Sequence, residues 1–167
     1  MRPMLAGASL AALVAVAAPD LAAPAEQLAR GAYLAKIMDC TGCHTGGALV
    51  GQPDPQLHLA GSSIGFMIPD LGYFYPPNLT PDPETGLGGW SEADIVRAVR
   101  TGVRPDGREL APVMPWRSYA ALADDDAQAL AAYLKGLPPV RNAVPAMTGA
   151  AQPAPAPYLA VVVPTGG

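Results

Sequence analysis

The sequence predicts an all-α fold in which three main helices are joined by long loops. Apolar residues recur with helical period in the segments 26–38, 91–101 and 124–137. Between them the chain is rich in turn-forming residues, with 18 glycines and 20 prolines among 167 residues. Large core side chains are scarce, since the chain has only 2 Phe and 2 Trp. The polypeptide alone is therefore poorly supplied with apolar bulk for a core.

The length suits one domain with flanking segments. We expect a secretory signal over residues 1–25, a folded domain over 26–140 and a tail over 141–167. The first segment has a positive start, an apolar run of 14 residues from Leu5 to Ala18 and small residues near position 25. The run is short of the ~20 residues that span a bilayer. Cleavage and export are expected, and an uncleaved anchor is the alternative.

The first helix of the domain, over 26–38, carries Leu28, Ala32 and Ala35 at helical spacing. It delivers the chain directly into the cysteine-containing segment that follows. Gly31 and Ala32 are small enough for another helix to cross closely at this point. The sequence therefore predicts a helix–helix crossing near Gly31.

Residues 40–44 read Cys-Thr-Gly-Cys-His, the attachment pattern of a c-type haem. Cys40 and Cys43 can each add to one haem vinyl group, and His44 then lies beneath the ring as an axial ligand of the iron. Gly42 is expected to leave room for the ring. One covalently bound haem would supply the missing core bulk, and it would use both cysteines, so no disulfide is expected.

Two other interpretations of this segment have less support in the sequence. A thioredoxin-like redox pair needs alternating strands and helices, which the sequence does not indicate. A structural zinc site usually takes four protein ligands, and here Cys40, Cys43, His44 and the distant His58 would have to provide them. Haem attachment is the interpretation that the pattern favours.

The segment 45–77 is rich in Gly and Pro but also carries many apolar side chains. We interpret it as an ordered loop that wraps the haem, because an apolar loop needs something to pack against. Residues 78–90 have turn chemistry throughout. From this region, Tyr75, Asn78 and Trp90 are candidate cofactor-binding residues.

The helix over 91–101 is the best marked. Ser91 is its expected N-cap, Asp94 completes a capping box, and Gly102 stops it. The helix over 124–137 ends at the Gly and Pro residues near its C-terminus. Its first acidic residue, Asp124, is expected to take over the cap because Ala123 cannot.

A second axial ligand is needed on the opposite side of the iron. Met114 lies in a loop stiffened by Pro112 and Pro115, which would present its thioether without backbone collapse. A methionine is more often a core gap-filler, but this loop is too polar for a core segment. The residues alone leave several candidates open: Met67, Met114, His58 and, with less support, Met38 and Met147.

The segments CTGCHT, YPPNLTPDPETGLGGWSEADIVRAVRTGVRPDGREL, APVMPWRSYAAL and ALAAYLKGLPPV resemble those of class I mono-haem c-type cytochromes. The similarity is specifically to cytochrome c subunits of periplasmic alcohol and sugar-acid dehydrogenases, and it covers residues 25–145. It implies that the helix before the haem segment crosses the terminal helix. It also implies that His44 is the proximal ligand and Met114 the distal one. Such subunits often carry three haem segments, whereas this chain has one.

The resemblance implies a periplasmic electron carrier rather than an enzyme. It would take electrons from a dehydrogenase and pass them to a terminal oxidase or another cytochrome. A haem protein that binds ligands or acts as a peroxidase is one alternative, and an obligate subunit of a dehydrogenase complex is another. The formal net charge of −4 argues against a general affinity for nucleic acid.

Cationic residues are concentrated in and after the second of the main helices. Five of the ten lie within 21 residues: Arg97, Arg100, Arg104, Arg108 and Arg117. A solvated face is the simpler interpretation. The alternative is that Arg97, Arg100 or Arg104 pairs with a haem propionate beside Trp90, because a guanidinium meets a carboxylate at two points. We take Arg100 as the candidate for this role.

The tail over 141–167 is dense in Ala and Pro, which favours extended chain. Residues 158–163 are apolar and rich in β-branched side chains. We expect this run to fold back onto the domain or to dock on a partner.

Overall fold

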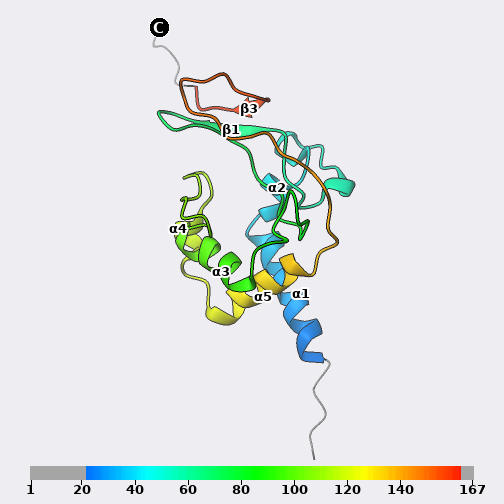
Figure 1. The fold of residues 1–167 in the computed structure, drawn as a ribbon. Coiled ribbons are helices and arrows are strands. Elements are labelled where there is room, and N and C mark those ends of the chain that lie inside the picture. The colour runs from blue at the N-terminus through cyan, green and yellow to red at the C-terminus, as the bar shows by residue number, and fades with distance from the viewer. Residues whose placement is uncertain (1–21, 163–167) are drawn as a thin grey trace, which may run out of the picture.

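The computed structural model describes residues 22–162, so most of the expected signal segment lies outside the described residues. The helices are α1 (Ala22–Ile37), α2 (Cys40–His44), α3 (Glu92–Thr101), α4 (Trp116–Tyr119) and α5 (Asp124–Lys135), with 3-10 turns η1 (Ala48–Val50) and η2 (Pro55–Leu57). The strands are β1 (Gly65–Ile68), β2 (Gly72–Phe74) and β3 (Tyr158–Leu159) (Figure 1). None of the helices within residues 22–162 is long and apolar enough to cross a membrane.

Helices α1 and α5 form the most extensive packing in the structure, and they cross at Gly31 (Figure 1). A Cβ at position 31 would overlap the carbonyl oxygen of Ala129 and lie 2.5 Å from the Cβ of Tyr133. The absence of a side chain therefore brings the two backbones together. Arg30 and Asp126 add an ion pair at 2.7 Å on the surface of the same crossing. The close crossing predicted from the small residues is confirmed.

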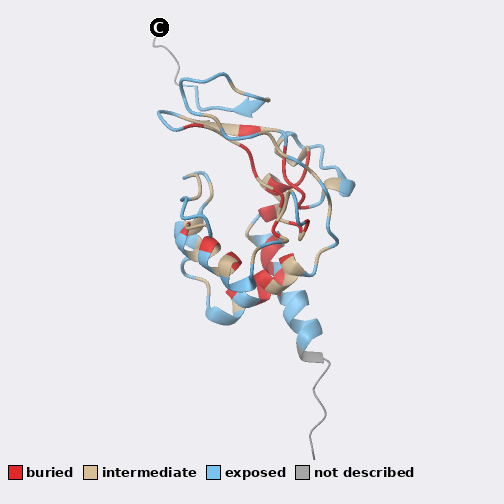
Figure 2. Ribbon diagram, in the orientation of Figure 1, coloured by how far each residue is buried: buried red, intermediate tan, exposed pale blue. Residues whose placement is uncertain are grey.

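The buried residues gather at this crossing and around α2 (Figure 2). Apart from Cys40, the fully buried members of the main cluster are aliphatic: Leu34, Ala35, Leu59, Leu87, Ile95, Ala129, Leu130, Ala131 and Leu134. Aromatic residues such as Trp90 and Tyr133 contact the cluster only from partly buried positions. The core therefore reaches α2 directly through Cys40.

The predicted capping of α3 is confirmed. The hydroxyl of Ser91 accepts from the backbone N–H of Asp94, and the Asp94 carboxylate accepts from the N–H of Ser91. Gly102 ends the helix with φ of 74°. The expected cap of α5 at Asp124 is wrong: Ala123 is the N-cap and makes no side-chain bond. Three aspartates in the first turn instead place negative charge at the positive end of the helix dipole.

The fold is predominantly helical but not all-α, which corrects the prediction. The three strands form one sheet in the order β2-β1-β3, with β1 and β2 antiparallel and β1 and β3 parallel. Phe66 lies opposite Phe74, and Met67 lies opposite Tyr73. Apolar and aromatic side chains suit both faces of this short ribbon. The segment interpreted as a loop therefore contains a hairpin that wraps beside α2.

The third strand comes from the tail, which runs back along the domain to reach the hairpin (Figure 1). We call residues 140–159 the C-terminal strap. The amide of Asn142 donates to the Ala60 carbonyl at 2.9 Å, and the hydroxyl of Tyr75 donates to the Ala156 carbonyl at 2.7 Å. Tyr73 and Thr148 exchange two backbone hydrogen bonds. The described part of the tail thus folds back onto the domain, while Val161 and Val162 beyond the strap are exposed.

Candidate haem-binding site

His44, at the end of α2, has a buried imidazole that is held from one side only. Its Nδ1 lies 2.8 Å from the carbonyl oxygen of Pro77. A carbonyl can only accept, so Nδ1 carries the proton and Nε2 has a free lone pair. Burial lowers the pKa of His44, which favours the neutral ring that a metal requires. The arrangement is that of an imidazole oriented by a backbone carbonyl and ready to ligate iron.

Cys40 and Cys43 are three positions apart on the same helix, so both thiols lie on one side of α2. Both are free thiols in the structure. Burial raises the pKa of Cys40 to about 11 and also raises the pKa of Cys43. Thioredoxin-like pairs depend on a lowered thiol pKa, which is the opposite of what this site provides. The raised pKa values therefore do not suit a thioredoxin-like pair, and the position of both thiols on one side of α2 is compatible with attachment of a group.

The zinc interpretation is not supported by the described part of the chain. Within residues 22–162 no group of three or more His, Cys, Asp or Glu side chains is placed to hold a metal ion. His58 is exposed, at the edge of a surface groove next to Lys36 and Tyr133. It is therefore not gathered with the cysteines and His44.

Gly42 lies against the turn that precedes α2, and its expected role of leaving room for the haem stays a prediction. A Cβ at position 42 would lie 2.6 Å from Cγ of Asp39. Asp39 adopts a left-handed conformation with φ of 56°, which turns the chain from α1 into α2. The glycine is thus explained by this tight turn.

The polar side-chain atoms of Asn78 and Tyr75 form hydrogen bonds with other residues of the chain. The Asn78 amide donates to the Val140 carbonyl at 2.7 Å, and its oxygen accepts from the N–H and hydroxyl of Thr80. Tyr75 is bonded to Ala156. Asn78 directly follows Pro77, so these bonds fix the loop whose carbonyl holds His44. Direct contact of either side chain with the haem stays a prediction.

Met114 is half-buried in a turn that leads into α4. Its backbone N–H donates to the Ala111 carbonyl at 2.9 Å, and its own carbonyl accepts from the Trp116 N–H at 2.8 Å. Trp116 packs on Gly102 so closely that a Cβ there would lie 2.5 Å from the indole ring. The loop is therefore ordered on both sides of Met114.

The other candidate ligands have different surroundings. Met67 lies on β1, opposite Tyr73. Met147 is exposed, and its sulfur accepts from Arg108 at 3.1 Å. Met38 contacts the aliphatic core from the end of α1.

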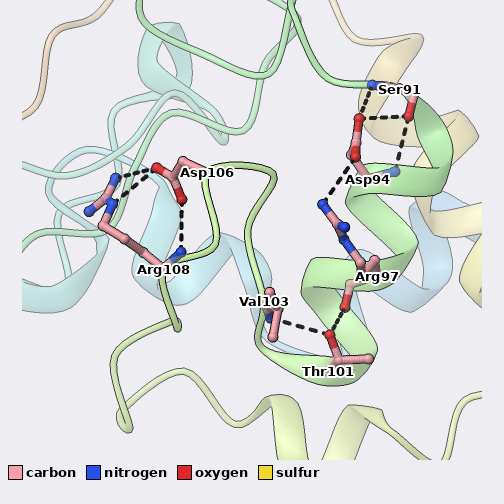
Figure 3. Close-up of polar contacts among 7 residues, drawn as sticks. All are labelled: Ser91, Asp94, Arg97, Thr101, Val103, Asp106 and Arg108. Carbon is pink, nitrogen blue, oxygen red and sulfur yellow. Dashed lines mark hydrogen bonds and ion pairs between the residues drawn. The ribbon is translucent and has the colours of Figure 1, made fainter.

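The arginine cluster is mostly paired with carboxylates (Figure 3). Arg97 pairs with Asp94 at 3.4 Å, and Arg108 pairs with Asp106 at 2.9 Å. The candidate for the propionate contact, Arg100, pairs with Asp124 at 2.5 Å. These three guanidinium groups already have partners.

Arg104 also has a carboxylate within ion-pair distance. Its Nε is buried and makes no hydrogen bond within residues 22–162, although Asp106 lies 3.5 Å away. The guanidinium lies 5.2 Å from the centre of the Trp90 ring, within cation–π range. Lys135 fixes the backbone before this ring by donating to the carbonyls of Leu87, Gly88 and Trp90. The structure thus brings Trp90 together with Arg104, whereas the sequence favoured Arg100.

Two site residues have no signal in the sequence. Pro77 acts through its carbonyl on a histidine 33 positions away. Tyr119 donates from its hydroxyl to the carbonyl of Met38, 81 positions away, at 2.6 Å. Both contacts join segments that are distant in the chain, and only the fold shows them.

Similarity to known proteins indicates which prosthetic group this site binds. Residues 28–138 match the family described as cytochrome c. The chain belongs to the cytochrome c family. Members of the family carry covalently bound haem c and transfer electrons. The two free thiols of α2, and the His44 ring with Nδ1 hydrogen-bonded and Nε2 available, fit a haem.

Relatives of this cytochrome include subunits of dehydrogenases. It is 42% identical over 112 residues, 66% of its length, to the cytochrome c subunit of a quinone alcohol dehydrogenase from Gluconobacter oxydans. It is 43% identical over 115 residues, 68% of its length, to the gluconate 2-dehydrogenase cytochrome c subunit of Pantoea cypripedii. It is also 41% identical over 126 residues, 73% of its length, to a subunit of the nicotinate dehydrogenase of Pseudomonas putida. The matches span 22%, 24% and 10% of those proteins, so the cytochrome matches only a part of each relative.

Proposed function

We propose that this protein is a periplasmic electron carrier with one haem c, ligated by His44 and Met114 in a class I arrangement. The observation that carries the proposal is the buried His44 ring, whose Nδ1–H is held by Pro77 while Nε2 stays free. The ring follows Cys40 and Cys43 on the same helix, so attachment and ligation are positioned together. The same proposal includes export of the protein, directed by the expected signal in residues 1–25, because export would place the carrier outside the cytoplasm.

The protein residues divide the work of holding the haem. Cys40 and Cys43 would hold the haem through two thioether bonds, and His44 and Met114 would provide Nε2 and Sδ as ligands of its iron. The bound haem supplies a one-electron exchange between Fe(III) and Fe(II). The Pro77 carbonyl orients the imidazole and raises its basicity. Thioether ligation by Met114 favours the reduced iron and raises the potential.

The relatives favour a dehydrogenase as the electron donor. Each is named as a subunit of a dehydrogenase, acting on alcohol, gluconate or nicotinate. An obligate subunit of such a complex is therefore the second candidate, and co-purification with a large dehydrogenase would distinguish it from a free carrier. A terminal oxidase or another cytochrome is the proposed acceptor.

Met114→Ala tests the carrier proposal. Removing the thioether is expected to open the sixth position, giving high-spin iron that binds carbon monoxide and a lower reduction potential. Absorption spectra of the holoprotein with and without carbon monoxide, and a redox titration, measure these effects. Met67→Ala is the matched control, and it is expected to keep the wild-type spectrum. If only Met67→Ala gives high-spin iron that binds carbon monoxide, the distal ligand is Met67 and not Met114.

Arg104→Gln tests the propionate contact. A partly buried guanidinium beside an anionic propionate would stabilise Fe(II), because reduction adds negative charge, so the loss of Arg104 is expected to lower the midpoint potential. Arg97→Gln removes an exposed arginine that already pairs with Asp94, and it is expected to leave the potential near wild type. Potentiometric titration of the holoproteins gives the midpoint potentials of Arg104→Gln, Arg97→Gln and Arg100→Gln for comparison. A larger shift for Arg100→Gln would restore the original candidate.

A further inference from the structure

Tyr119 forms the hydrogen bond that joins the Met114 segment to the segment entering Cys40. Its hydroxyl donates to the Met38 carbonyl at 2.6 Å. The acceptor is two residues before Cys40, just past the end of α1. Burial first, and then the nearby cysteines and Asp39, raise the pKa of Tyr119 to about 12. The hydroxyl therefore keeps its proton at neutral pH and remains a donor.

Tyr119 is linked to Met114 by a short and well-bonded stretch of backbone. The Trp116 N–H donates to the Met114 carbonyl at 2.8 Å, and the Tyr119 N–H donates to the Pro115 carbonyl at 3.2 Å. A displacement of the Met114 backbone is therefore expected to move α4 as well. On the other side, the Trp116 ring lies against Gly102 at the end of α3.

We propose that Tyr119 is a positioning residue that latches Met114 to the iron by tying α4 to the haem-attachment segment. The inference rests on the proposed ligation by Met114 and adds a residue outside the ligand set. The Trp116 contact anchors α4 to α3, while the Tyr119 bond anchors it to the half of the protein that carries His44. A movement of the Met114 backbone that draws the sulfur away from the iron would strain the Tyr119 bond, because that backbone is hydrogen-bonded to α4, so the bond opposes such a movement.

Displacement of the sulfur by imidazole in the oxidised holoprotein measures this effect. In Tyr119→Phe we expect apparent imidazole affinity to rise about three- to tenfold, as the loss of one net hydrogen bond predicts. The variant should keep its covalent haem and low-spin spectrum without imidazole, because all ligands remain. The matched control is Tyr133→Phe. Tyr133 is also half-buried, but its hydroxyl makes no hydrogen bond to another residue in 22–162, so imidazole affinity should match wild type.

The outcomes separate the latch from the ligand assignment. Equal imidazole affinity in Tyr119→Phe and Tyr133→Phe overturns the latch, even if Tyr119→Phe melts at a lower temperature, because that result describes a purely structural bond. If Met114→Ala keeps six-coordinate, low-spin iron, the ligand assignment fails and the latch fails with it. If Met114→Ala opens the iron and only Tyr119→Phe gains imidazole affinity, both stand.

Discussion

Replacing Cys40 and Cys43 together with alanine is expected to make all of the haem extractable by acidified organic solvent. The two thiols are the only cysteines in the chain, so no other residue can form a thioether to the vinyl groups. His44 would still offer its imidazole, but an axial bond does not survive acid. The measurement is the haem absorbance of the organic and aqueous phases after extraction of the purified protein.

Met114→Ala is the control for this extraction, since it alters a proposed axial ligand and leaves both thiols in place. Its haem is expected to stay with the protein. Haem that remains bound after the double cysteine change would refute the attachment proposed for α2. The single changes refine the result, because each removes one of the two bonds and should leave the haem attached by the other.

Gly31→Ala is expected to destabilise the holoprotein by roughly 1–3 kcal/mol, the usual cost of overpacking a tight contact. The sign is informative, because alanine within a helix is normally better than glycine by about 0.5–1 kcal/mol. Here the added Cβ meets the backbone of Ala129, and α5 can yield only by moving as a whole. Denaturant unfolding followed by circular dichroism measures the loss.

Gly89→Ala is the matched control, since a Cβ at position 89 meets nothing within 4 Å. It is expected to change the free energy of unfolding by less than about 0.5 kcal/mol, as for other exposed positions. A neutral or stabilising Gly31→Ala would contradict the close crossing of α1 and α5.

The parts of the fold that could be predicted are those with local causes. Ser91, Asp94 and Gly102 define the ends of α3 through bonds that span only a few residues. Gly31 indicated that a helix could cross closely, because a missing side chain is visible in the sequence, and the resemblance to cytochromes identified the terminal helix as its partner. The Cys-x-x-Cys-His pattern could indicate the candidate site because its chemistry is confined to one short helix.

The parts that were missed depend on distant partners. Strand β1 is completed by β3, which lies about ninety positions further along the chain, so the hairpin region gave no clear period of its own. Arg100 and Arg104 could not be separated in the sequence, because the difference is that Arg104 lies over the Trp90 ring with a buried Nε that makes no hydrogen bond within residues 22–162. The Pro77 carbonyl is a backbone group, and no residue type announces its role.

The C-terminal strap has a consequence for the order in which the molecule folds. Its contacts from Asn142 to Ala60 and from Ala156 to Tyr75 close loops of 82 and 81 residues, which are entropically costly and slow to form. The helix that carries Cys40, Cys43 and His44 is made of local contacts and precedes the strap in the chain. The thiols are thus presented before the strap closes over the loops that carry Ala60 and Tyr75, so the strap adds its contacts only after α2 has formed.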